Sequence, residues 1–258
     1  MVQQYLFCYR LPWSAPIQGP AVNTPSDIIA HRGYSARYRE NSLPAWLAAI
    51  KAGADMIEVD VRRTRDGVFV CAHDPDLRLA ADARLIMETD HEEIDRIQVH
   101  GEPVAPKLFS AIHALPDNIP LLLDIKDERP ESLEALLEIC LANEDRFVFG
   151  LHSLESLKLV RRRSSVRILG LLNGEPKEDD AFFALGGTIL RLWESMADAD
   201  RIRRLREARH PIWMTTGGWG TGRDVGDFEP ARLRAHVVAG ISGFLVNDPV
   251  LARKALHA

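Results

Sequence analysis

The sequence predicts an α/β protein built as one (β/α)8 barrel. Its 258 residues match the roughly 250 that such a barrel needs. Short apolar runs alternate with segments of helical periodicity, as they do in parallel α/β folds. Nine strands are indicated, but one follows its neighbour through a tight turn and cannot be a parallel barrel strand. Eight strands then remain, each followed by a helix.

The bulk composition is that of a soluble globular protein. Hydrophobic residues make up 46%, charged residues make up 27%, and the net charge is −5. This balance indicates no general affinity for nucleic acid or for anionic membranes. The cysteines Cys8, Cys71 and Cys140 are widely spaced and include no CxxC pair, which favours a reducing compartment over a disulfide framework.

No apolar run approaches the roughly 20 residues of a membrane span, and the N-terminus does not resemble a signal peptide. We therefore expect a cytoplasmic protein with no membrane span. Residues 1–24 are expected to be a Pro-containing surface arm, and residues 25–258 a single barrel domain, because no low-complexity or charged block divides them. The oligomeric state stays open, with a homo-oligomer as one alternative.

The elements follow from periodicity and end signals. "DIIAH" (27–31) predicts the first strand, and 42–54 predicts a helix with Ser42 as N-cap and Pro44 in its first turn. Further strands are expected at 56–62, 68–73, 119–125, 146–151, 166–172, 188–193, 211–216 and 243–248. Further helices are expected at 90–98, 107–115, 131–142, 153–164, 177–185, 198–209 and 229–239.

The segments 56–62 and 68–73 are too close to be parallel neighbours. A parallel pair needs a crossover of a dozen or more residues, whereas Asp66-Gly67 is a favoured hairpin turn. We therefore expect 68–73 to form an antiparallel β-hairpin excursion after the second barrel strand. If Asp66 and Gly67 are the turn centre, Asp60 lies opposite His73, and Val61 lies opposite Ala72.

Three acids lie on strands that should be apolar. Glu58 and Asp60 are two residues apart, so they share one face of their strand. Asp124 follows three leucines at the end of another strand. Buried acids must be paired or bound to a cation. Three carboxylates without a cysteine predict one hard divalent cation, Mg²⁺ or Ca²⁺.

Two histidines are expected near these acids. His31 ends the first strand in "AHRG", and the hairpin brings His73 back towards the acids. An imidazole pair can supply one base and one acid near neutral pH. With a divalent cation, Arg32 and Lys126, the three carboxylates sum to about +1, which complements a phosphodiester monoanion. Of the other histidines, expected on the surface or in packing, only His152 could reach the same mouth.

These residues resemble those of the glycerophosphodiester phosphodiesterases. The similarity covers roughly residues 27–250 and rests on "HRG", "EN" (40–41), "GADMIEVDVRRTRDGVFVCAHD" and "DIK", with weaker matches in "IWMTTG" and "GISGFLVNDP". It implies a distorted (β/α)8 barrel, a divalent metal, and hydrolysis of a small-molecule phosphodiester to glycerol 3-phosphate and an alcohol. The resemblance implies that His31 and His73 are the catalytic pair and that Glu58, Asp60 and Asp124 bind the metal. It also implies that Arg32, Glu40 and Lys126 position the phosphate and the histidines.

Three positions depart from the family pattern. "REN" replaces the usual "PEN", Asp124 replaces a glutamate, and "APKLFSAI" (105–112) lacks the usual acids. Similar Asp-x-Lys spacing occurs in the sphingomyelinase D group. One alternative is therefore a lysophospholipase D, a sphingomyelinase D-like phosphodiesterase or lyase, or a sugar-phosphodiester hydrolase with the same site. A second is a non-catalytic phosphate-binding barrel.

The segment "TTGGWGTGRD" (215–224) follows a barrel strand and is expected at the mouth. Trp219 in this segment could cap the alcohol or glycerol group, or the segment could be a flexible surface loop. Trp193 and Glu194 end another strand and could also line the pocket.

Overall fold

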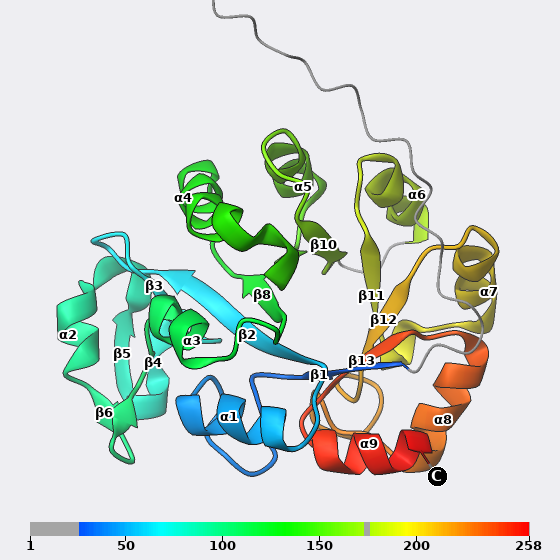
Figure 1. Cartoon of the computed structure of the whole chain (residues 1–258), viewed down its shortest axis with the longest axis horizontal. Coiled ribbons are helices and arrows are strands. Elements are labelled where there is room, and N and C mark those ends of the chain that lie inside the picture. Colours follow the sequence, from blue (N-terminus) through cyan, green and yellow to red (C-terminus); the bar gives the residue numbers. More distant parts are fainter. Residues whose placement is uncertain (1–25, 173–175, 258) are drawn as a thin grey trace, which may run out of the picture.

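A computed structural model describes residues 26–172 and 176–257, so the expected arm at 1–24 lies outside the described residues. Parallel strands close into a barrel, and helices surround it (Figure 1). Within the described chain the ring contains eight strands, and pairing of β1 with β2 closes it. The predicted fold class, a (β/α)8 barrel with an excursion after its second strand, is confirmed.

The ring follows chain order. Its strands are β1 (Asp27–Ala30), β2 (Met56–Arg63), β8 (Leu121–Ile125), β9 (Phe147–Leu151), β10 (Arg167–Gly170), β11 (Ile189–Trp193), β12 (Ile212–Thr215) and β13 (Gly243–Val246). The carboxyl ends of parallel strands meet at one mouth of a barrel. Residues that follow these strands therefore come together there.

The helices lie outside the strands (Figure 1). They are α1 (Leu43–Lys51), α3 (Leu108–Ala114), α4 (Pro130–Cys140), α5 (Leu154–Arg161), α6 (Pro176–Ala184), α7 (Ala199–Glu207), α8 (Pro230–Ala239) and α9 (Pro249–His257). Ser42 caps α1 as predicted, accepting a hydrogen bond from the Ala45 amide at 3.3 Å. Helix α9 follows the last strand, where a helix was expected but no range was predicted, and it buries Pro249, Ala252 and Ala255.

Two apolar layers hold the barrel together. One lies between the strands and the outer helices and includes Trp46 and Phe182. The other fills the interior, where strand alternation directs every second side chain. Its members are Ile29, Met56, Leu122, Val148, Leu169, Leu171, Ile189, Trp213 and Leu245. Apolar side chains therefore fill the barrel interior below the mouth.

The hairpin after β2 is present, but its predicted register is wrong by one residue. Strand β3 (Phe69–Cys71) pairs antiparallel with β2, and Val61 lies opposite Cys71. Asp60 therefore lies opposite Ala72, whose amide donates to the Asp60 carbonyl at 3.2 Å. The reason is a three-residue loop, 65–67, in place of a two-residue turn: the Thr64 amide bonds to the Val68 carbonyl, and Gly67 has φ +90°, the geometry of a turn with a bulge.

The excursion continues beyond β3 as a small unit beside the barrel (Figure 1). It contains two short antiparallel pairs and helix α2 (His91–Asp95), which is shorter than the expected 90–98. The pairs are β4 (Asp76–Leu77) with β5 (Asp82–Leu85), and β6 (Gln98–Val99) with β7 (Glu102–Pro103). A separate apolar cluster that includes Leu77, Ile86 and Ile94 stabilises it. Over the described ranges, no helix combines the length and apolar character that crossing a membrane requires.

Gly33 is expected to be essential for the turn after β1. It has φ +86°, and a Cβ there would lie 2.8 Å from the carbonyl carbon of Ala45 in α1. Gly33→Ala should lower the free energy of unfolding through strained backbone, about 1–2 kcal/mol, and through the added clash. Urea denaturation measures the loss. Gly101→Ala is the matched control, since Gly101 has φ +83° and nothing within 4 Å of a Cβ. Equal losses in the two variants would contradict the close approach of α1.

Candidate functional site

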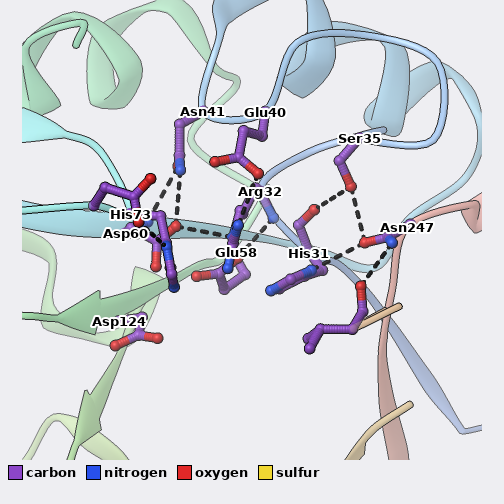
Figure 2. A network of polar contacts seen from close by, with 12 residues as sticks. His31, Arg32, Ser35, Glu40, Asn41, Glu58, Asp60, His73, Asp124 and Asn247 are labelled. Atoms are coloured by element: carbon purple, nitrogen blue, oxygen red, sulfur yellow. Dashed lines mark hydrogen bonds and ion pairs between the residues drawn. The ribbon is translucent and has the colours of Figure 1, made fainter. Parts of the chain in front are cut away.

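His31 lies just beyond β1, with its side chain directed into the mouth beside Asn247 (Figure 2). Its Nδ1 is 3.0 Å from the Asn247 Oδ1 atom. The Asn247 amide nitrogen donates to the Val225 carbonyl at 2.8 Å, which fixes the amide oxygen towards His31. Nδ1 of His31 therefore donates, and its Nε2 holds a free lone pair. Burial, followed by the charge of Arg32, lowers the pKa of His31 to about 4, so the ring is neutral at pH 7.

In Figure 2, His73 lies beside Asp60, and Glu58 lies between these two residues and His31. His73 is more accessible than His31, with 41% of its side chain exposed. Its Nδ1 is 3.1 Å from the Asp74 Oδ1 atom. A carboxylate can only accept here, so the His73 Nδ1 donates this hydrogen bond. The two histidines thus differ: one faces an amide, the other a carboxylate.

The three predicted acids converge in the structure. Glu58 and Asp60 are on the inner face of β2, and Asp60 lies opposite Asp124 in the pairing of β2 with β8. One carboxylate oxygen from each residue lies within 4.8 Å of the others. Glu58 and Asp60 are buried, and Asp124 is partly buried. The set offers only oxygen atoms, as hard divalent cations prefer.

Two cations contact this cluster. The Arg32 guanidinium lies 3.1 Å from Asp60 and donates to the Glu40 carboxylate at 2.7 Å. The backbone amide of Arg32 donates to Glu58 at 2.6 Å. The Lys126 ammonium bridges Asp60 at 2.9 Å and Asp124 at 2.6 Å. Four carboxylates therefore surround two cations, and one divalent cation would balance the remaining negative charge.

The three acids differ in the direction of their pKa shifts. Burial, together with the charges of Asp60 and Asp124, raises the pKa of Glu58 well above its usual range. Burial alone would raise the pKa of Asp60, but Lys126 and Arg32 lower it overall. Burial would also raise the pKa of Asp124, whereas a hydrogen bond from His152 and the charge of Lys126 lower it. Glu58 is thus the carboxylate whose charge lacks compensation from the protein, and the donor set fits a bound divalent cation.

Three further residues complete the geometry. Asn41 donates to the Asp60 carboxylate at 2.8 Å, His152 Nε2 lies 2.8 Å from the Asp124 carboxylate, and Asn247 orients His31. Each had a sequence signal: Asn41 belongs to the "EN" pair, His152 follows a strand, and Asn247 stands in "NDP". Their partners lie far away in the sequence, so the contacts could not be assigned from it.

The far wall of the mouth comes from β11 and the loop after β12. Trp193 ends β11, and Trp219 on the loop is 89% exposed. The Glu194 carboxylate is buried and holds the loop, because it accepts from the Gly217 amide at 2.8 Å and from the Arg223 guanidinium at 2.6 Å. Its contacts thus fix the loop at the mouth, while contact of the two tryptophans with a ligand stays a prediction.

Comparison with known proteins agrees with this architecture. The model of the glycerophosphoryl diester phosphodiesterase family matches residues 31–208. A Mycobacterium tuberculosis protein named "Probable glycerophosphodiester phosphodiesterase 2" is 35% identical over 233 residues, which are 86% of this chain and 80% of that protein. A glycerophosphodiester phosphodiesterase of Arabidopsis thaliana is 37% identical over 87 residues, 33% of this chain, and the match spans only 22% of the plant protein.

The fold has a close counterpart among solved structures. An Oleispira antarctica phosphodiesterase, solved in complex with the product sn-glycerol-3-phosphate, superposes with a TM-score of 0.79 over 91% of this chain and 98% of that one. The two sequences are 18% identical, so this likeness is one of fold. From the family match, which covers most of the chain, we conclude that this protein belongs to the glycerophosphoryl diester phosphodiesterase family.

Proposed function

We propose that the protein hydrolyses glycerophosphodiesters, small-molecule substrates, to glycerol 3-phosphate and an alcohol. The observation that carries the proposal is that His31 and His73 lie on either side of Glu58 in Figure 2, each with its Nδ1 hydrogen-bonded. Family membership supports the reaction class, and the Oleispira antarctica protein was solved with sn-glycerol-3-phosphate. The substrate's alcohol group is not part of the proposal.

Glu58, Asp60 and Asp124 would hold one divalent cation, Mg²⁺ or Ca²⁺. A bound divalent cation supplies charge stabilisation to a phosphoryl oxygen. The raised pKa of Glu58 supports this assignment, because a buried carboxylate without sufficient positive charge holds its proton. Asp124 is shorter than the family's usual glutamate. Its hydrogen bonds with Lys126 and His152 hold its carboxylate towards the other two acids.

His31 is the proposed base. Its Nε2 lone pair is free because Nδ1 donates to Asn247, and its lowered pKa keeps the ring neutral. It would take a proton from the nucleophile, either a water or the adjacent glycerol hydroxyl. Attack by the hydroxyl would form a cyclic phosphate, which a water would then open to give glycerol 3-phosphate. Asn247 would hold the ring in place during this transfer, and Ser35 supports the same Asn247 oxygen with a 3.0 Å hydrogen bond.

His73 is the proposed acid. The Asp74 carboxylate accepts from Nδ1 and orients the ring, and the exposed position of His73 suits contact with a departing alcohol. His73 would give its Nε2 proton to the leaving alkoxide. Arg32 and Lys126 would position the phosphate from their places beside Asp60, with Glu40 orienting the Arg32 guanidinium through its 2.7 Å contact.

The substrate assay tests the reaction itself. The purified protein with Mg²⁺ or Ca²⁺ should release glycerol 3-phosphate from glycerophosphocholine or glycerophosphoethanolamine, followed by ³¹P NMR. Bis(p-nitrophenyl) phosphate serves as a chromogenic diester that lacks glycerol. A cyclic phosphate as the end product would replace hydrolysis with a lyase reaction. Absence of turnover, with glycerol 3-phosphate still bound, would indicate a non-catalytic phosphate-binding barrel.

Substitution of either histidine tests the acid–base pair. His31→Ala and His73→Ala should each lower kcat on glycerophosphocholine at least about 10²-fold, the usual scale for loss of a general acid or base. His113→Ala is the control, because His113 is exposed on α3, where its ring bonds to the Phe109 carbonyl at 2.8 Å and packs on the Phe109 ring. Near-normal kcat in either mouth variant would refute the assigned pair.

Removal of the cation tests the acidic cluster. EDTA should abolish activity, and Mg²⁺ or Ca²⁺ added in excess should restore it. Calorimetry of Mg²⁺ binding provides a readout independent of turnover, and Glu58→Gln should weaken this binding because it removes one of the three carboxylates. Glu134→Gln, on the exposed surface of α4, should leave it unchanged. Full activity after chelation would eliminate the cation's role.

A further inference from the structure

Arg191 is a charged residue inside the barrel. It is the third residue of β11, and its side chain lies on the same face of the strand as that of Ile189, a member of the interior cluster. It pairs in register with Trp213, another interior residue. Strand β11 stands four places from β2 around the ring, so Arg191 faces the acidic cluster from the opposite wall.

The Arg191 guanidinium has no hydrogen-bond or ion-pair partner within the described residues. It is 7% exposed, and its Nε and Nη1 atoms are buried without a hydrogen bond. Other buried arginines are satisfied: Arg201 pairs with Asp179 at 2.6 Å, and Arg146 donates to Asp117 and to backbone carbonyls. A buried charge without a partner is costly and needs an explanation.

The surroundings of Arg191 leave its guanidinium charged and fix its orientation. Burial lowers the pKa of Arg191 to about 10, so the group stays cationic at neutral pH. Asp124 is the acid that acts on this charge, but hydrogen bonds with Lys126 and His152 already occupy its two oxygens. The Trp193 ring lies 4.0 Å from the guanidinium carbon. The ring covers one face of the guanidinium, and the Nε and Nη1 atoms on its edge have no protein acceptor among the described residues.

The charge balance at the mouth indicates which kind of ligand the Arg191 guanidinium can bind. With a divalent cation, the cluster of Glu40, Glu58, Asp60, Asp124, Arg32 and Lys126 is neutral, and a phosphodiester would add one negative charge. Arg191 supplies one positive charge across the mouth. Two N–H groups of an arginine fit two oxygens of a phosphoryl group.

We propose that Arg191 is a substrate-binding residue that donates hydrogen bonds to the phosphoryl group of the glycerol phosphate moiety, from the wall opposite Glu58 and Asp60. This inference rests on the proposed function and extends it to β11. Trp193 then acts as a positioning residue, because its ring holds the guanidinium in place. The arrangement places positive charge on both sides of the bound phosphate.

Calorimetry with sn-glycerol 3-phosphate tests the proposal on the full chain with Mg²⁺ present. Arg191→Met should weaken binding at least about 10-fold, on the scale of one hydrogen bond to a charged group. It should raise KM for glycerophosphocholine similarly and change kcat less. Arg191→Lys, which keeps the charge but loses the planar edge, should recover part of the affinity. Arg203→Met is the control, because Arg203 is exposed on α7.

A structural role would give different results. If Arg191 binds substrate, Arg191→Met removes an unpaired buried charge, and Tm should stay unchanged or rise. If Arg191 has a structural role, both Arg191 variants should have a lower Tm. Wild-type affinity for sn-glycerol 3-phosphate in either folded Met or Lys variant with intact Mg²⁺ binding overturns the proposal. So does weakened Mg²⁺ binding without a change in affinity for the phosphate, because Arg191 would then act through Asp124. If the wild-type protein neither binds sn-glycerol 3-phosphate nor turns over glycerophosphodiesters, the proposed function itself fails.

Discussion

The mouth of the barrel depends on the interactions made by one buried carboxylate, that of Asp60. An ionised group in this position is stable only if charges and hydrogen bonds replace the water it has lost. Arg32, Asn41 and Lys126 provide that replacement. They come from the loop after β1 and from the end of β8, so one carboxylate ties together chain segments on both sides of β2. The same contacts bring the backbone amide of Arg32 to Glu58.

The two walls of the mouth are built differently. On the wall of β1, β2 and β8, polar side chains satisfy one another, and Glu58 is left with a raised pKa. On the wall of β11, Glu194 uses its carboxylate to hold the loop after β12, while Arg191 has no hydrogen-bond or ion-pair partner among the described residues. The surplus negative charge on one wall and the unpaired positive charge on the other lie across the space where the strands end. A cation and an anion bound together would satisfy both.

Local patterns predicted most of the barrel because each strand and helix buries its own apolar face. The strand alternation of Glu58 and Asp60 and the strand-end position of Asp124 were sufficient to predict the acidic cluster. The register of the hairpin was not predictable from Asp66-Gly67 alone, because that pair fits both a two-residue turn and a three-residue loop with a bulge. A helix was expected after each strand, but no range was predicted for α9, which buries Pro249, Ala252 and Ala255.

By itself, the sequence determined the fold class, the order of the strands and the identity of the acids and histidines at their ends, since these follow from periodicity and spacing. Only the tertiary structure decided which partners those side chains have. Asn247 reaches His31 across 216 residues, and His152 reaches Asp124 across 28. It also decided that Arg191 lies opposite the acids without a hydrogen-bond or ion-pair partner in the described part of the chain. Such contacts depend on closure of the ring, which joins the first strand to the last, and no local pattern encodes the distance between side chains on different strands.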